Sequence, residues 1–196
     1  MSTTHDDAPI AARVRQVEAL LEQRGWLAPG EIDERIDEFA AGGSPANGAA
    51  IVARAWLDAG FRERLLADGN ATITELGFTM GGALQEQKLT VVANAEDEHH
   101  VVVCTLCSCY PIALLGPSPG WYKSEAYRSR VVRDPRGVLR EFGLELPAST
   151  RITVWDASAE SRYMVLPRRP AGTDGLGERE LANLVTRKGL IGTALV

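Results

Sequence analysis

Hydrophobic residues recur at helical spacing in the first part of the chain and predict two amphipathic helices. The first runs from Pro9 to about Arg24, and Gly25 ends it. The second opens at Pro29 and ends in Gly42-Gly43-Ser44-Pro45. Each apolar stripe is narrow, which indicates a helix that presents one face to a neighbour. The stripes consist of Ile10, Val14, Val17, Leu20 and Leu21 in the first helix and Ile32, Ile36 and Phe39 in the second.

Further helices and strands alternate along the rest of the chain. An alanine-rich stretch predicts helix over about residues 46–67, and turn-forming residues separate the later elements. Asp134-Pro135 is typical of a helix start, with Asp as the cap and Pro in the first turn. We expect helices at 71–77, 121–130, 134–143 and 178–186, strands at 88–95, 101–104, 151–156 and 162–166, an irregular loop at 111–119 and an extended tail at 189–196.

Composition narrows the class of protein. Of the 196 residues, 45% are hydrophobic, which is ordinary for a globular protein. The net charge is −5 and no basic stripe is present, so nucleic acid is not an expected partner. No apolar run is long enough to span a membrane, and the polar N-terminus lacks the regions of a secretory signal. We therefore expect a cytoplasmic protein, in which thiols are not routinely paired.

All three cysteines fall within the hexapeptide Cys104-Thr105-Leu106-Cys107-Ser108-Cys109, here called the cysteine loop. A valine run precedes it and Tyr110-Pro111 follows it, a pattern typical of a buried strand that ends in a tight loop. Three soft sulfur ligands on one short loop indicate a site for a single metal ion.

The spacing of the sulfurs also suggests which ion would fit. They converge only if the backbone curls around the metal, and this brings the main-chain amides of Ser108 and Cys109 close to it. A deprotonated amide nitrogen requires a strongly Lewis-acidic ion, which disfavours zinc. Three sulfurs and two amide nitrogens leave one octahedral position open, as a catalytic metal needs.

Other readings of the cysteines stay open at this point. They are free thiols that serve as small buried hydrophobes, or they form a disulfide, which between Cys107 and Cys109 would be strained. Cys104 and Cys107 have the spacing of a redox pair, although the expected βαβ context is not evident. A zinc site that adds His99 and His100 is a further alternative, but neighbouring side chains on a strand point to opposite faces.

The cysteine loop resembles the metal-binding motif of nitrile hydratase α subunits, a motif shared with the related thiocyanate hydrolases. The resemblance is close over residues 85–196 and looser over the N-terminal third. It continues through Trp121-Tyr122-Lys123-Ser124, Tyr127-Arg128, Val131-Val132-Arg133 and Arg162-Tyr163-Met164-Val165-Leu166-Pro167.

The resemblance implies a catalytic subunit that hydrates a nitrile to an amide at a low-spin trivalent metal. Thr105 is similar to the cobalt class, so one Co(III) per chain is implied, held by Cys104, Cys107, Ser108 and Cys109. Oxidation of Cys107 to sulfinate and of Cys109 to sulfenate is also implied, with the Cys109 oxygen as a candidate nucleophile or base. The implied partners are one or more β-type subunits, a cobalt-insertion activator protein and a small-molecule nitrile.

The negative charge of such a centre calls for nearby cations. Three thiolates and two amide anions exceed a trivalent ion by about two charges, which is costly in a low-dielectric pocket. Arg162 and Arg128 are the candidates in this chain, and a surface ion pair is the alternative for each. The resemblance places Arg162, Asp156 and Gln85 near the site, with Arg162 among the catalytic residues, and places two further arginines on the β subunit.

Helices followed by strands predict an α+β fold. We expect a disordered tail at residues 1–8, a helical arm at 9–70 that contacts a partner, and a metal-binding catalytic domain at 71–196. The alternative for the N-terminal helices is that they belong to the chain's own core. The resemblance implies that this domain is a layered α/β structure whose mixed sheet carries the cysteine loop.

Two other functions use the same cysteines. The resemblance extends to thiocyanate hydrolysis, although Trp155-Asp156 and Ala159-Glu160 are more similar to nitrile hydratase. A subunit that delivers cobalt to another protein is the third hypothesis, but delivery does not require Trp121-Tyr122 or the long loop after the cysteines.

The sequence departs from the family just after the cysteine loop. Most nitrile hydratases have an aromatic residue and then a proline where this chain has Ile112 and Ala113. An indole buries more surface than a sec-butyl group, and losing a proline frees the backbone. One hypothesis is a site enlarged for a bulky, heteroaromatic or nucleoside-like nitrile. The alternative is that another side chain refills the space.

Overall fold

The computed structural model describes residues 8–81 and 87–196, and it separates into two compact units at the boundary between Ala41 and Gly42. Of the disordered tail expected at residues 1–8, residues 1–7 lie outside the described residues, as does the candidate site residue Gln85, whereas Ala8 begins the first helix. Each unit is described by itself below.

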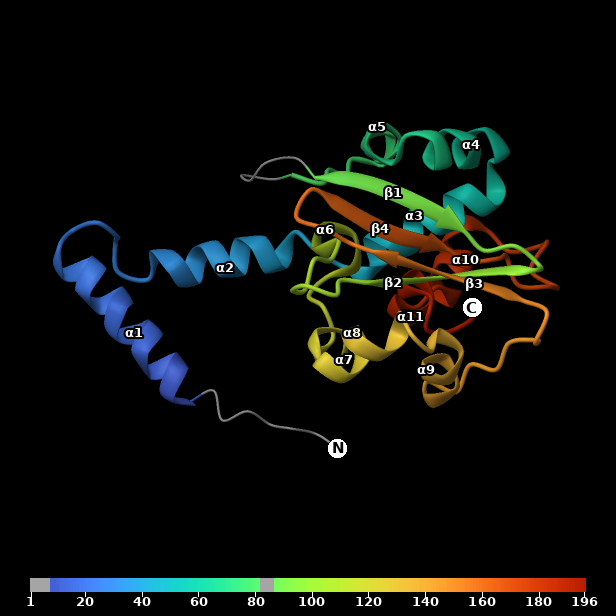
Figure 1. The fold of residues 1–196 in the computed structure, drawn as a ribbon. Coiled ribbons are helices and arrows are strands. Elements are labelled where there is room, and N and C mark those ends of the chain that lie inside the picture. The colour runs from blue at the N-terminus through green and yellow to red at the C-terminus, as the bar shows by residue number, and fades with distance from the viewer. Residues whose placement is uncertain (1–7, 82–86) are drawn as a thin grey trace. The chain divides into compact units, whose positions relative to one another are not determined.

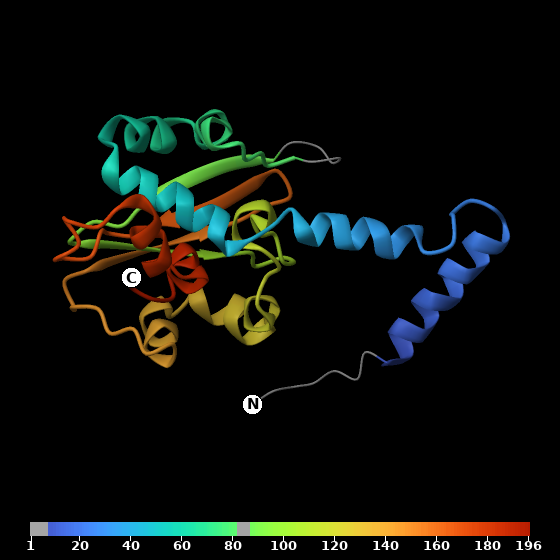
Figure 2. The ribbon, with the colours of Figure 1, turned by 180° about the vertical axis from the view of Figure 1, so that it is seen from behind.

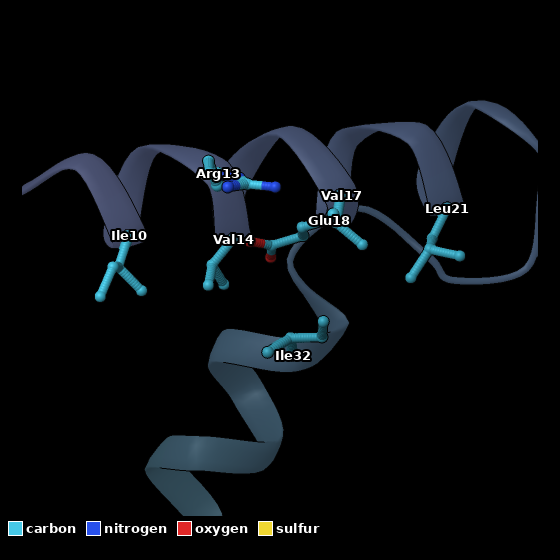
Figure 3. A pocket seen from close by; sticks show the side chains of 7 residues that line it. All are labelled: Ile10, Arg13, Val14, Val17, Glu18, Leu21 and Ile32. Carbon is cyan, nitrogen blue, oxygen red and sulfur yellow. The ribbon is translucent and has the colours of Figure 1, made fainter.

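The first unit contains two helices, α1 (Ala8–Gln23) and α2 (Glu31–Ala41). Ile10, Val14, Val17 and Leu21 project from α1 towards the side on which α2 carries Ile32 (Figure 3). These side chains line an open apolar groove of about 410 Å³. Ile10, Val14 and Val17 remain more than half exposed, so this unit does not bury its own apolar stripe. Both helices predicted for this region are confirmed.

The second unit contains all four strands, surrounded by short helices (Figures 1 and 2). Its helices are α3 (Pro45–Leu57), α4 (Ala59–Ala67), α5 (Gly69–Ile73), the 3₁₀ turn η1 (Thr74–Leu76), α6 (Ile112–Leu115), α7 (Gly120–Lys123), α8 (Glu125–Val131), α9 (Pro135–Glu141), α10 (Glu178–Leu184) and α11 (Arg187–Ile191). Its strands are β1 (Lys88–Ala93), β2 (Glu98–Val103), β3 (Arg151–Asp156) and β4 (Ser161–Leu166).

The strands pair in parallel as two two-stranded sheets, β1 with β4 and β2 with β3. Helices and strands together confirm the α+β class, but the strand arrangement differs from the single mixed sheet that we expected. Parallel partners need a long crossover, and here residues 104–150, with α6 to α9, connect β2 to β3. The chain reverses between β1 and β2, where the Ala95 amide donates to the Glu98 carbonyl.

A continuous apolar core lies between the strands and the helices. Helices α3, α10 and α11 cover one face of the strands, in front in Figure 2, while α4 and α5 lie along β1. Fully buried side chains come from both sets of elements and include Ile51, Val52, Phe61, Leu65, Val101, Val103, Met164, Val165, Leu190 and Ile191.

Capping side chains divide the helices more finely than the apolar pattern indicated. Asp58 ends α3 and caps α4, because its carboxylate accepts from the Phe61 amide, so the segment predicted at 46–67 is two helices. Thr186 caps α11 in the same way through the Gly189 amide. The tail expected to be extended from residue 189 therefore begins in a helix. The predicted start of α9 at Asp134-Pro135 is confirmed.

The separate N-terminal unit is shorter than the arm that we expected at 9–70. Helices α3 to α5 pack into the second unit, where Ile51, Val52, Phe61 and Leu65 belong to the main core. Alanine-rich helices with small faces suit close packing against strands, and the apolar periodicity of α3 does not distinguish a core helix from a partner-binding one. Among the described residues, no helix has both the length and the hydropathy of a membrane span.

The turn after α11 packs against the backbone of β2. Gly192 has φ +87°, and a Cβ at this position would lie 1.9 Å from the His100 carbonyl oxygen. His99 is 2% exposed, with its Nε2 2.7 Å from the Gly192 carbonyl oxygen and its Nδ1 3.2 Å from the Asn94 amide nitrogen. Burial lowers the pKa of His99, so the ring is neutral at pH 7 and donates from Nε2.

We expect Gly192→Ala to destabilise the protein by about 2–5 kcal/mol, from left-handed backbone strain plus a backbone clash. Gly172 is a matched control, because it has φ +77° but a Cβ added there would meet no heavy atom within 4 Å. Gly172→Ala should lower the free energy of unfolding by only about 1–2 kcal/mol. Urea unfolding of both variants measures the difference, and equal losses would contradict the proposed contact with β2.

Candidate metal centre

Strand β2 carries the cysteine loop (residues 104–109) at its C-terminal end. Val101, Val102 and Val103 are buried against the core, and Cys104, which follows them, is 1% exposed. The chain then emerges from the core: Leu106 is 88% exposed, and Cys107 and Ser108 are also exposed. A rigid buried strand therefore fixes the first sulfur, while the other two lie on a loop that turns back over it.

The three thiols converge. Cys107 Sγ lies 3.4 Å from Cys104 Sγ and 3.3 Å from Cys109 Sγ, and the Cys107 amide donates to Cys104 Sγ over 3.3 Å. All three sulfurs lie within 4.8 Å of one another. At a metal–sulfur distance of about 2.3 Å, sulfurs at right angles are ~3.3 Å apart and tetrahedral ones ~3.8 Å apart. The Cys104–Cys107 and Cys107–Cys109 sulfur distances are closer to the right-angled value than to the tetrahedral one.

The loop backbone adds two nitrogens near the same point. The thiols of Cys109 and Cys104, and to a smaller extent the backbone amides of Ser108 and Cys109, lower the pKa of Cys107 to about 7. Burial raises the pKa of Cys109 to about 12. Cys107 therefore ionises before Cys109. The three sulfurs lie together, and the two amide nitrogens remain predicted ligands.

Asp156 braces the loop from the neighbouring strand. The parallel register places Asp156 beside Val103, and its carboxylate accepts 2.9 Å and 2.6 Å hydrogen bonds from the amide and hydroxyl of Thr105. The Ala157 amide continues the pairing by donating to the Val103 carbonyl. Asp156 thus contacts the loop backbone rather than the sulfurs.

Two arginines approach the loop from different elements. Arg128 of α8 donates from Nη1 to the carbonyls of Thr105, at 3.4 Å, and Cys107, at 3.2 Å. Arg162 of β4 is 8% exposed and acts electrostatically on Cys109, favouring its thiolate. Among the described residues neither forms an ion pair, so the surface-pair alternative does not describe them.

Arg162 has a buried donor without a hydrogen-bond partner. Its Nη1 caps the carbonyls of Ser158, Ala159 and Ser161, which fixes the side chain, while its buried Nε has no hydrogen-bond partner. A buried, unpartnered guanidinium nitrogen near a thiol is a ready donor to an oxygen placed on sulfur.

Tyrosines of α7 and α8 donate hydrogen bonds to the backbone of the cysteine loop and of β2, a role that the sequence pattern did not reveal. The Tyr122 hydroxyl donates to the Cys109 carbonyl at 2.9 Å, and Tyr127 donates to the Val102 carbonyl at 2.7 Å. Tyr110, Trp121 and Phe142 pack edge-on against them. In the sequence, Tyr122 and Tyr127 stood out only as parts of the stretches that resemble the family.

The alternatives for the cysteines do not fit this geometry. All three are free, and Cys107 is exposed, so they are neither a disulfide nor a set of core hydrophobes. His99 faces Asn94 and Gly192, while Trp155 donates to His100. Within residues 8–81 and 87–196 the one cluster of possible metal ligands contains Cys104, Cys107 and Cys109 and no histidine.

Comparisons with known proteins agree with the site. The family model described as "Nitrile hydratase, alpha chain" matches residues 8–194. The cobalt-containing nitrile hydratase subunit alpha of Pseudonocardia thermophila is 50% identical, over 93% of this chain and 89% of its own length. The low-molecular-weight cobalt-containing counterpart from Rhodococcus rhodochrous is 48% identical, over 95% of this chain and 88% of its own.

Other similar proteins differ in metal or reaction. A double mutant of the Fe-type nitrile hydratase from Comamonas testosteroni Ni1 superposes with a TM-score of 0.89 at 40% identity, covering 97% of this chain and 91% of that one. Thiocyanate hydrolase subunit gamma of Thiobacillus thioparus is 45% identical, over 77% of this chain and 65% of its own. The match over nearly the whole chain, together with the three converging cysteines, shows that this chain belongs to the nitrile hydratase α-chain family.

Proposed function

We propose that this chain is the catalytic, metal-binding subunit of a cobalt-type nitrile hydratase, which adds water to a nitrile to give an amide. The observation that carries the proposal is the convergence of three thiols, spaced 3.3–3.4 Å, on a loop braced from β3 and α7. Such bracing suits a centre that must keep its geometry during turnover.

Cobalt is the metal that we propose, held by Cys104, Cys107 and Cys109 and by the amides of Ser108 and Cys109. Two of the most similar relatives are named as cobalt-containing, and the chain shares the threonine after the first cysteine that we associate with that class. When bound as Co(III), one per chain, the ion supplies Lewis acidity towards the nitrile or water.

The residues of the chain have distinct roles in this proposal. In the mature enzyme Cys107 is a sulfinate and Cys109 a sulfenate. The Cys109 oxygen either takes a proton from the attacking water and passes it to the nitrile nitrogen, or attacks the nitrile carbon and becomes the amide oxygen, in which case water replaces it on sulfur. Arg162 partly neutralises the negative charge of the thiolate and amide ligands and donates from its unpartnered Nε to a sulfur-bound oxygen. Arg128 and Asp156 hold the loop backbone in place.

A second subunit completes the site. Leu106 is 88% exposed beside the cysteines, and the N-terminal helices leave an apolar groove open. Exposed apolar surface of this kind is typical of a protein interface. A β-type subunit would cover both and supply further arginines, and a separate activator protein would insert the cobalt. In this proposal the chain is active only in that assembly.

Thiocyanate hydrolysis is the second candidate, because a thiocyanate hydrolase with partially modified cobalt centres superposes with a TM-score of 0.85 at 39% identity. Assays of the purified assembly with benzonitrile and with thiocyanate separate the two reactions. Cobalt delivery is the weaker alternative, since a carrier must release its ion and this loop is tied down from three elements.

We expect the chain, co-expressed with its partner subunit, to contain about one cobalt and to gain about 48 Da, the mass of three oxygens on two cysteines. Elemental analysis and intact mass spectrometry measure both quantities. A Cys107→Ala variant should lose cobalt and the oxygens together. Active protein with stoichiometric zinc and unmodified thiols would refute the proposal.

We expect Asp156→Asn to retain cobalt ~10- to 100-fold less well, because an amide cannot accept both hydrogen bonds from Thr105. Cobalt content after dialysis against a chelator measures retention independently of activity. Glu160→Gln is the matched control, a carboxylate on the following turn that accepts from Ser158 instead. Equal retention in both variants would show that the Asp156 brace does not matter.

The turn after the cysteine loop determines substrate size in our proposal. Residues 112–115 form one helical turn, α6, inside the segment expected to be an irregular loop. Gly43 packs against the Ile112 backbone, and the Asn47 side chain donates to the Ala113 carbonyl at 2.8 Å. The backbone is thus held by α3, so room for a bulky nitrile comes from the smaller side chain at Ile112 rather than from a more adaptable loop.

In the assembled enzyme, Ile112→Trp should lower kcat/KM for a bicyclic nitrile relative to acetonitrile by ~10- to 200-fold. The cause is the indole, which refills the space that the sec-butyl group leaves. Leu184→Trp at the exposed end of α10 is a control for the added bulk and should leave the ratio unchanged. An equal change for both substrates in Ile112→Trp would refute the enlarged site.

A further inference from the structure

A cavity of the second unit lies at the opposite end of the strands from the cysteine loop. Its volume is about 300 Å³. It is bounded by the C-terminal ends of β1 and β4 and by α3 and α4. The lining residues are Ala55, Trp56, Arg62, Asn94, Leu166, Pro167, Arg168 and Arg169.

The strand directions separate this cavity from the metal centre. β1 and β4 are parallel and end together at the cavity. After β1 the chain turns and enters β2. β2 then runs back to the cysteine loop, a length of about 20 Å for six residues. In both ribbon views α6, which follows the cysteine loop, lies at the other end of the strands from the β1 arrowhead (Figures 1 and 2).

The lining of the cavity is positively charged, although the chain as a whole is acidic. It contains three arginines and no carboxylate, although the chain has 26 acidic residues against 21 basic ones. In the part of the chain that the structure describes, neither Arg62 nor Arg168 has a hydrogen bond or an ion pair from its guanidinium. By contrast, the neighbouring Arg54 and Arg64 both pair with carboxylates.

Arg169 forms a fixed wall of the cavity. Its Nε and Nη2 donate to the Thr173 hydroxyl and carbonyl, at 3.1 and 2.6 Å, and its Nη1 donates to the Trp56 carbonyl at 3.4 Å. Trp56 in turn donates from Nε1 to the Pro167 carbonyl at 2.8 Å. Three of the five guanidinium N–H bonds of Arg169 are therefore used, and two remain.

We propose that this cavity is a binding site for a small oxyanion, a phosphate or a carboxylate. Arg62 of α4 and Arg168, which follows β4, are exposed lining residues whose guanidinium groups have no partner among the described residues, and Arg169 presents a third charge that is already held in place. Guanidinium groups bind planar carboxylates and phosphates through paired N–H donors, and a preorganised arginine loses less conformational entropy on binding. The site is independent of the proposed nitrile chemistry.

The proposal is tested by calorimetric titration of the assembled enzyme in a chloride buffer. Inorganic phosphate and acetate are titrated separately. Saturable binding of either probe is expected. Phosphate alone would identify a phosphate-type ligand, and acetate alone a carboxylate. The double variant Arg62→Gln/Arg168→Gln should weaken binding at least ~10-fold, because each lost charge-assisted hydrogen bond contributes strongly.

Arg140→Gln is the matched control, because Arg140 is an exposed arginine on α9 with no carboxylate partner among the described residues. It should bind the probe as the unaltered enzyme does. The proposal is overturned if neither probe binds, if the double variant binds as tightly as the unaltered enzyme, or if Arg140→Gln weakens binding equally. Cobalt content serves as a check that each variant is assembled.

Discussion

Three thiols within 3.4 Å of their neighbours face an electrostatic constraint, because they cannot all ionise without a cation between them. Burial, followed by the hydrogen bond with Cys107, raises the pKa of Cys109, while the hydrogen bonds from Cys109 and Cys104 lower the pKa of Cys107. A loop left to itself would relieve the crowding by opening. The surrounding structure prevents this, so much of the chain around the site is best understood as a frame that holds three sulfurs together.

The frame comes from segments that are distant in sequence. Asp156 reaches Thr105 only because β3 pairs with β2 in one register, and a shift by one residue would turn its carboxylate to the other face. Tyr122 reaches the Cys109 carbonyl because α7 packs beneath the loop in an aromatic cluster. Arg128 adds a third attachment from α8. Each contact binds the backbone, which leaves the sulfurs free to serve as ligands.

The sequence revealed the local parts of this arrangement and missed the long-range ones. The cysteine spacing indicated converging ligands, and the Asp134-Pro135 signal located the start of α9, because both depend on residues close together in the chain. Strand pairing was not readable, since parallel register depends on packing across more than fifty residues. The expected arm includes α3 for the same reason, because the apolar face of a helix does not indicate which element or subunit packs against it. Tyr122 was visible only as part of a motif.

The parallel pairing also sets an order of events during synthesis of the chain. Glu98 of β2 pairs opposite Arg151, and Lys88 of β1 opposite Ser161. The strand that ends in the cysteines thus leaves the ribosome long before the partner strand that brings Asp156 to it, and before Gly192 closes its other side. Until then the three thiols belong to an unbraced, oxidisable segment. The contacts that hold the three sulfurs together are therefore complete only after the last third of the chain has been synthesised.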